Sequence, residues 1–201
     1  APPPLGDVGG AGPGAAAVVG RGLAMDLLSV GIDLDLAPVM DVDSNPANPV
    51  IGPRSFGTEP GIVSACGAAM IDAMQSRGLA ACAKHFPGHG DTDLDSHHDL
   101  PVLRHEMDRI REIELPPFAA AIRADVAAIM TTHVVFEAID PGVPATMSRA
   151  AIEGLLRGEL GYDGVVISDD LEMAAIAEST EVGEAAIRSV EAGVDLLLCC
   201  H

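Results

Sequence analysis

Five short apolar runs, separated by segments with helical periodicity, limit the fold of this chain more than any other feature. The runs cover residues 32–39, 79–83, 126–130, 164–167 and 194–198. Runs of this length that are nearly all apolar are typical of strands whose two faces are both covered. Strands that alternate with helices form βα units, and such units assemble into a parallel sheet. The sequence therefore predicts an α/β fold built on five parallel strands.

Four segments between these runs carry helix signals. Thr58 can cap a helix whose first turn holds Pro60 and whose end is followed by Gly78. Further helices are predicted over residues 18–28, over 106–113 before Pro116-Pro117, and from Ser148 to about Gly161. The Gly/Pro-rich opening, residues 1–14, is predicted as a loop.

Polar side chains follow the apolar runs directly, at the points where the predicted strands end. They are Asp41, Lys84-His85, Thr132-His133, Asp169-Asp170 and His201. Because the carboxyl ends of parallel strands meet at one edge, such side chains can build one site, as in a TIM-type (β/α)8 barrel. A nucleotide-binding doubly wound sheet would need G-x-G-x-x-G after its first strand, which this sequence lacks there.

The length indicates that the predicted barrel is incomplete. A whole TIM-type barrel takes about 250 residues, and five strands are too few to close one. We therefore predict that residues 1–201 form a single partial domain, a barrel truncated at both ends with about five of its βα units.

The charge balance argues against nucleic acid as a partner. The chain has 11 basic and 30 acidic side chains, and its formal net charge is −19. Such a charge opposes binding to nucleic acid through phosphates and disfavours docking on anionic lipid. No apolar run reaches the roughly 18–20 residues of a membrane span. The cellular compartment stays open, because any targeting signal would lie upstream of Ala1.

The densest group of polar residues follows the second predicted strand. Residues 84–98 hold Lys84, the only lysine, and four of the seven histidines. Loops this long in a compact domain are usually functional. Aspartates at 91, 93 and 95 have the spacing of an EF-hand, but Ser96 and Val102 stand where that motif needs Gly and Glu. Calcium binding is therefore not predicted.

Two interpretations of this loop stay open from the residues alone. A zinc site would be built from His85, His89, His97 or His98 together with an aspartate. These ligand types suit zinc, although the Lys84 ammonium would repel a dication. Alternatively, Asp95 and His97 are close enough in sequence to meet across a turn, where the carboxylate would orient and polarise the imidazole as a proton carrier.

Two further polar segments complete the candidate site. Asp170 is well placed to cap the helix expected after the run 164–167, which leaves Asp169 to face the site. A carboxylate opposite a proton carrier is the minimum that glycoside hydrolysis requires. The segment 45–57 contains three prolines that stiffen it, and it delivers Arg54, whose guanidinium suits hydrogen bonding to a polar ligand.

Three motifs together resemble glycoside hydrolase family 3, in particular its β-N-acetylglucosaminidase branch. They are DVDSNPANPVIGPRSFG (41–57), KHFPGHGDTDLDSHHDLP (84–101) and VVISDDLEM (165–173), and the similarity covers essentially the whole chain. The resemblance implies a TIM-type barrel that performs retaining hydrolysis of terminal β-linked N-acetylhexosamine, without a cofactor. It also implies a nucleophile, Asp169, and an acid–base residue, His97, paired with Asp95. The substrate-binding residues that it implies are Arg54, Lys84, His85, Asp41 and His133.

The chain also departs from the family pattern. An acidic motif that supplies another sugar-binding aspartate and an arginine in the family is missing, and so is the last part of the barrel. A truncated sugar-binding remnant without turnover is therefore an alternative, beside a zinc-dependent hydrolase that uses His85, His89 and His97. The sequence leaves open whether the substrate is a cell-wall fragment, a chitin oligomer or another glycoside.

Overall fold

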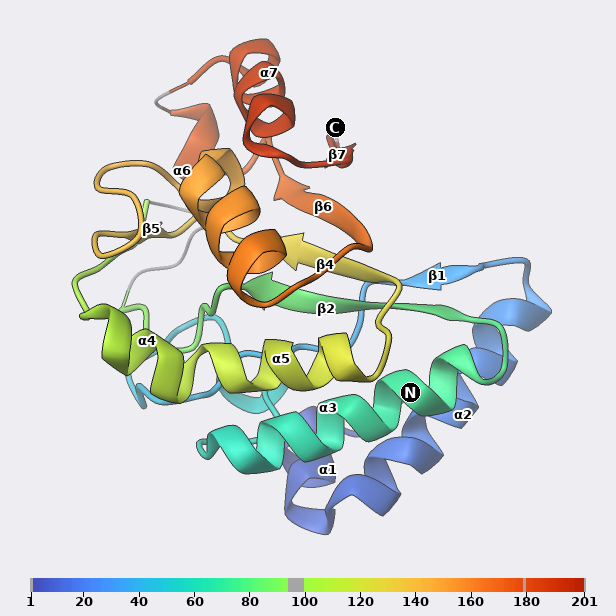
Figure 1. The fold of residues 1–201 in the computed structure, drawn as a ribbon. Helices are drawn as coiled ribbons and strands as arrows, with labels where there is room; N and C mark the ends of the chain where they lie inside the picture. Colours follow the sequence, from blue (N-terminus) through green and yellow to red (C-terminus); the bar gives the residue numbers. More distant parts are fainter. Residues whose placement is uncertain (1, 94–99, 179, 201) are drawn as a thin grey trace.

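The computed structural model describes residues 2–93, 100–178 and 180–200. Within these residues, the centre of the fold is a five-stranded sheet in which every neighbouring pair is parallel (Figure 1). Its strands, in the order in which they lie, are β1 (Leu34–Asp35), β2 (Ala80–Phe86), β4 (Ala128–Thr131), β6 (Val165–Asp170) and β7 (Leu196–Leu198).

The order of the strands distinguishes a barrel from a doubly wound sheet. In a doubly wound sheet the order reverses at a switch point, whereas here each strand pairs with the next strand of the sheet along the chain. The sheet curls into a half barrel (Figure 1). The predicted α/β fold, a truncated TIM-type barrel, is therefore confirmed, and each predicted apolar run overlaps one of the strands, although β2, β4 and β6 extend beyond the end of their runs.

The helices between these strands cover one side of the sheet. The helices α3 and α5 pack against each other and against β2, and α2 packs on α3 (Figure 1). A separate pair of parallel strands joins β3 (Val102–Leu103) to β5 (Val135–Phe136). The helical elements are α1 (Leu5–Ala11), α2 (Pro13–Ser29), η1 (Gly52–Arg54), α3 (Pro60–Gln75), α4 (Met107–Ile113), α5 (Leu115–Arg123), η2 (Ala145–Met147), the π-helix η3 (Ala150–Glu159), α6 (Ala174–Ala177) and α7 (Val182–Ala192). In the part of the chain that the structure describes, no helix is long and apolar enough to cross a membrane.

Alternate residues of the central strands belong to two different apolar clusters. On β2, Ala81 and Ala83 pack in the main core with the helices, whereas Cys82 packs in a second cluster with Met130 and Ile167. Both faces of the central strands β2 and β4 are thus largely buried, which explains why these strands are nearly continuous apolar runs. Two residues beyond Cys82 and Ile167, the same alternation places Lys84 and Asp169 on the side away from the helices.

The first helices differ from the predictions. Residues 1–14 are not a loop, because α1 covers Leu5–Ala11 and its glycines allow close packing. A Cβ atom on Gly9 would lie only 1.7 Å from the carbonyl oxygen of Phe56. The helix α3 begins at Pro60 with Glu59, not Thr58, as its N-cap.

The capping prediction for the helix after residue 148 is confirmed. The Ala151 N–H donates to Ser148 Oγ at 3.1 Å, as expected of an N-terminal cap. The helix that follows is a π-helix rather than an α-helix.

Candidate active site

Polar side chains gather at the carboxyl ends of the central strands. Asp41 follows β1, Lys84 and His85 lie on β2, His133 follows β4, and Asp169 lies on β6. Asp41 contacts His85 directly, and the charge of the Asp169 carboxylate acts on both Lys84 and His133. Parallel strands therefore bring together side chains that are distant in sequence, as the sequence predicts.

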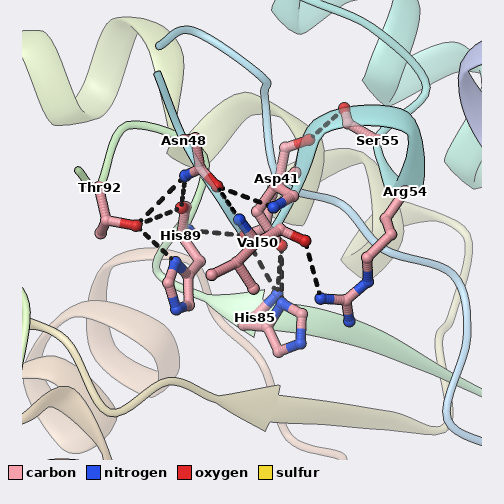
Figure 2. Close-up of polar contacts among 9 residues, drawn as sticks. Asp41, Asn48, Val50, Arg54, Ser55, His85, His89 and Thr92 are labelled. Atoms are coloured by element: carbon pink, nitrogen blue, oxygen red, sulfur yellow. Dashed lines mark hydrogen bonds and ion pairs between the residues drawn. The ribbon is translucent and has the colours of Figure 1, made fainter. Parts of the chain in front are cut away.

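Asp41 is buried and receives hydrogen bonds from two histidines (Figure 2). Its Oδ2 lies 2.7 Å from His85 Nδ1, and the main-chain N–H of His85 donates to Oδ1 at 3.2 Å. The main-chain N–H of His89 donates to the same Oδ1 at 2.7 Å. The Asp41 carboxylate therefore holds both the His85 ring and the turn that follows β2.

The charge of Asp41 is maintained by these contacts. Burial alone would raise its pKa, but the facing His85 imidazole, together with His89, outweighs burial and holds the pKa of Asp41 below 3.8. A carboxylate on Nδ1 of His85 fixes the orientation of the ring and leaves Nε2 as the nitrogen that a ligand can approach.

Asn48 connects the two loops that surround Asp41 (Figure 2). Its Nδ2 donates to the carbonyl oxygen of His89 at 2.8 Å and to Thr92 Oγ1 at 3.2 Å. Its Oδ1 accepts the N–H of Val50 at 2.8 Å. The proline-rich segment 45–57 is thereby fixed relative to the turn after β2.

Arg54 and Lys84 bring two positive charges to this edge. Arg54 ends η1, and its Nη1 donates to the carbonyl oxygen of Val50 at 3.2 Å (Figure 2). Burial lowers the pKa of Lys84 and the Arg54 guanidinium lowers it further, whereas Asp169 opposes both effects. Arg54 and Lys84 also line one cavity of about 420 Å³. The exposed Arg54 and the half-buried Lys84 and Asp169 therefore interact at this edge of the sheet.

The two aspartates at the end of β6 differ in their contacts. Asp169 Oδ1 accepts the N–H of Asp170 at 2.9 Å, and this is its one hydrogen bond within the described residues. Asp170 Oδ1 accepts the N–H of Glu172 at 3.1 Å and the N–H of Cys200 at 3.3 Å. The predicted capping role of Asp170 is wrong, because α6 begins only at Ala174 and Asp170 closes a turn before it.

His133 is buried, with internal contacts at both ring nitrogens. Nδ1 lies 2.9 Å from Thr146 Oγ1, and Nε2 lies 2.8 Å from the carbonyl oxygen of Asp170. Burial lowers the pKa of His133 below 6.5, because it outweighs the opposite effects of the Asp169 and Asp170 carboxylates. The ring is therefore neutral at pH 7, and its predicted contact with substrate stays a prediction.

Asp95, His97 and His98 lie outside the described residues, so their predicted roles stay predictions. Among the residues that are described, no three His, Cys, Asp or Glu side chains are grouped to hold a metal ion. Since the zinc interpretation uses residues beyond these, it stays untested. Asp91, the first aspartate of the EF-hand-like spacing, contacts His105 and Arg109.

Comparison with known proteins identifies the family. Residues 8–201 match the family described as "Glycosyl hydrolase family 3 N terminal domain". The chain belongs to glycosyl hydrolase family 3. Among family 3 relatives, the "Beta-hexosaminidase A" of Pseudoalteromonas piscicida is 42% identical over 192 residues, which are 90% of this chain and 32% of that protein.

Solved structures of family 3 proteins superpose on the half barrel. The β-N-acetylglucosaminidase from Paenibacillus sp. str. FPU-7 has a TM-score of 0.94 and 48% identity over 97% of this chain and 37% of its own. NagZ from Neisseria gonorrhoeae, in complex with N-trifluoroacetyl-D-glucosamine, has a TM-score of 0.86 and 37% identity over 98% of this chain and 57% of its own. The chain thus spans between about a third and just over half of these relatives.

A polar network beside this family 3 site was missed by sequence reasoning. Arg109 donates through Nη1 to both carboxylate oxygens of Glu114, at 2.6 and 2.7 Å, and its Nη2 lies 3.5 Å from Asp91. Glu114 also packs against Gly88, where a Cβ atom would lie 2.7 Å from Glu114 Cγ. No sequence pattern identified this network, because only the fold brings α4 and α5 to the turn after β2.

Proposed function

We propose that the protein that carries this chain is a retaining β-N-acetylhexosaminidase, in which residues 1–201 form part of one catalytic barrel domain. The observation that carries the proposal is the position of Asp169. It is the second-to-last residue of β6, at the edge where Lys84 and His133 also lie, in a chain similar to β-hexosaminidases. The proposed substrate is a terminal β-linked N-acetylhexosamine, in keeping with the N-acetylglucosamine analogue bound by the gonococcal relative.

Asp169 is the proposed nucleophile. Its carboxylate attacks the anomeric carbon, so that a bond forms between that carbon and a carboxylate oxygen while the bond to the leaving oxygen breaks. Protonated His97 gives its proton to the leaving oxygen. Neutral His97 then takes a proton from water, and the water oxygen attacks the anomeric carbon and releases Asp169. Two successive displacements retain the configuration of the sugar.

Asp95 is the proposed partner of His97. A carboxylate beside the imidazole orients the ring and stabilises the imidazolium that alternates with the neutral form. An unperturbed imidazole titrates near neutral pH, so it serves as acid and base with less adjustment than a carboxylic acid needs.

Arg54, Lys84 and His85 are the proposed ligands of the sugar hydroxyls. The guanidinium and the ammonium are hydrogen-bond donors only, and His85 presents Nε2 because Nδ1 faces Asp41. Asp41 therefore supports binding through His85, and its buried position makes this indirect role the one best supported.

The deciding experiment is hydrolysis of 4-nitrophenyl N-acetyl-β-glucosaminide by the complete product of the gene that encodes this sequence, with and without a chelator. We expect turnover that the chelator does not change, with the β anomer as the first product detected by NMR. Loss of turnover with chelator and recovery with zinc would instead support a zinc-dependent hydrolase. Sugar binding without any turnover would support the truncated remnant.

The role of His97 has its own test. We expect His97→Ala to slow hydrolysis about 100-fold or more for an alkyl glycoside, whose leaving oxygen needs a proton, and much less for an activated aryl glycoside. Measurement of kcat/KM for both substrates checks this expectation. Equal losses on the two substrates would contradict the role of His97 as the acid.

A further inference from the structure

A buried hydrogen-bond network joins the ends of β4 and β6 around Asp169. His133 lies between η2 and β6, with Nδ1 at 2.9 Å from Thr146 Oγ1 and Nε2 at 2.8 Å from the carbonyl oxygen of Asp170. The ring therefore links Thr146 to the main chain immediately after Asp169.

The same network reaches β6 on the other side of Asp169. Thr131 Oγ1 lies 2.9 Å from Thr146 Oγ1 and 3.3 Å from the carbonyl oxygen of Ile167. Thr131, Thr146 and His133 are all fully buried. The main chain of β6 is thus held two residues before Asp169 and one residue after it, by side chains that themselves lie outside β6.

The direction of these hydrogen bonds follows from the groups involved. The carbonyl oxygen of Asp170 can only accept, so Nε2 of His133 carries a proton. Burial lowers the pKa of His133 against the raising effects of Asp169 and Asp170, and the nearby His85 lowers it further. In the neutral ring Nδ1 is an acceptor for the Thr146 hydroxyl at 2.9 Å, and this hydroxyl also faces the carbonyl oxygen of Thr132 at 3.0 Å. The Asp170 carbonyl oxygen thereby selects the tautomer in which Nε2 is the donor, and Thr146 is the partner of the other ring nitrogen.

This arrangement suits a nucleophile. A carboxylate must lie close to the anomeric carbon and in line with the leaving group, and an error of about 1 Å can cost on the order of 100-fold in rate. A neutral imidazole that binds the Asp170 carbonyl oxygen fixes the main chain without forming an ion pair with the Asp169 carboxylate. A contact between His133 and substrate would instead need a ring nitrogen that faces the ligand.

We propose that Thr146 and His133 form a positioning pair that fixes the end of β6 and so places the Asp169 carboxylate for attack. This inference rests on the proposed function, because it gives Asp169 the role of nucleophile. It assigns His133 to the support of Asp169 and adds Thr146, which the sequence motifs did not single out.

The first test compares two amide replacements of His133. His133→Gln can place its amide nitrogen where Nε2 was, whereas His133→Asn places an amide near Nδ1 and loses the contact with Asp170. We expect His133→Asn to lower kcat about 100-fold with KM changed less than about threefold, and His133→Gln to lose about tenfold or less. A rise in KM with kcat unchanged in both variants would overturn the inference in favour of a substrate contact.

The second test uses Thr146→Val and Thr146→Ser. The valine keeps the shape of threonine and loses the hydroxyl, so we expect a lower kcat and a change in the ¹⁵N shift of His133 Nδ1, which loses its hydrogen-bond partner. The serine keeps the hydroxyl and should restore both. If the valine variant keeps the wild-type ¹⁵N shift of Nδ1 and the wild-type kcat, the inference is wrong.

The double variant Thr146→Val/His133→Asn separates positioning from unrelated damage. Substitutions at two residues that act through one contact do not have additive effects. The kcat of the double variant should therefore be no more than about threefold below that of His133→Asn alone. Additive losses of kcat would overturn the proposal that the two residues act as a pair. Absence of hydrolysis in the wild-type protein would overturn the proposed function itself, whereas an active wild type with an unaffected Thr146→Val variant would overturn this inference alone.

Discussion

Asp41 and Asp169 follow predicted strands in the same way, yet the structure surrounds them differently. Asp41 is fully buried, and its two oxygens contact His85, which lies on β2, and His89, which follows β2 (Figure 2). Asp169 is only partly buried, and within the described residues it accepts a single hydrogen bond, from the N–H of its neighbour Asp170. The Asp41 carboxylate stabilises the fold, whereas the Asp169 carboxylate has few contacts that would keep it from reacting.

The difference shows what a strand-end aspartate in a sequence can and cannot indicate. The pattern of an apolar run followed by a carboxylate gives the edge of the sheet at which the side chain lies. Its role depends on the donors that meet it, and these come from elsewhere in the fold: two histidines for Asp41, and a single adjacent N–H for Asp169. A carboxylate surrounded by donors stabilises structure, and one with few donors can attack or bind.

The largest expected effect is on catalysis. We expect Asp169→Asn to lower kcat by at least about 1000-fold, because an amide oxygen is a poor nucleophile, a loss of roughly 4 kcal/mol of transition-state stabilisation. Its free energy of unfolding should change by less than about 1 kcal/mol, since little of the fold depends on this side chain. Steady-state kinetics and chemical denaturation measure the two quantities. A variant that unfolds readily, or one that keeps its activity, would remove the contrast with Asp41.

Asp41→Asn should show the reverse pattern. The amide nitrogen of asparagine would face the donors of His85 and His89, so we expect the free energy of unfolding to fall by about 3 kcal/mol. Denaturation of the variant measures this loss, and Asp33→Asn is the matched control, because Asp33 is exposed and the change in charge is the same. If Asp41→Asn is as stable as the Asp33 variant, Asp41 is not the structural carboxylate of the pair.

The contrast between the two aspartates could not be predicted from the sequence, although the position of the site could. The apolar runs predicted the strands, and the residues after them predicted which side chains meet, because strand period and parallel order are local properties. The environment of Asp41 depends on Asn48, whose bonds to His89 and Thr92 join segments more than forty residues apart. Such contacts have no periodic signature.

The errors in the prediction have related causes. Glycines in α1 were interpreted as loop signals, but Gly9 is small because the Phe56 main chain packs against it. Aspartate often caps helices, but Asp170 accepts the N–H of Glu172 in a turn before α6 begins. In both cases a tertiary contact, rather than local propensity, decides the conformation.

The smallest expected effect concerns pH and compares the histidines beside the two carboxylates. Burial lowers the pKa of His89 near Asp41 and of His133 near Asp169, both from the ordinary value of 6.5. In the unfolded chain these rings bind protons below pH 6.5 while the folded protein resists protonation, so stability is present above this pH and is lost as the pH falls below it. The lowered pKa of Asp41 acts only below pH 3.8 and does not contribute in this range.

We therefore expect the free energy of unfolding of the wild type to fall between pH 7.5 and pH 5.5. The free energy of unfolding of the His133→Gln variant should fall by about 1 kcal/mol less over the same range. Urea denaturation at the two pH values measures the difference, and other titrating groups cancel between the two proteins. Equal pH dependence in both would mean that the His133 ring accepts a proton in the folded state. It would then carry a positive charge beside Asp169, and the proposed nucleophile would have a charged partner.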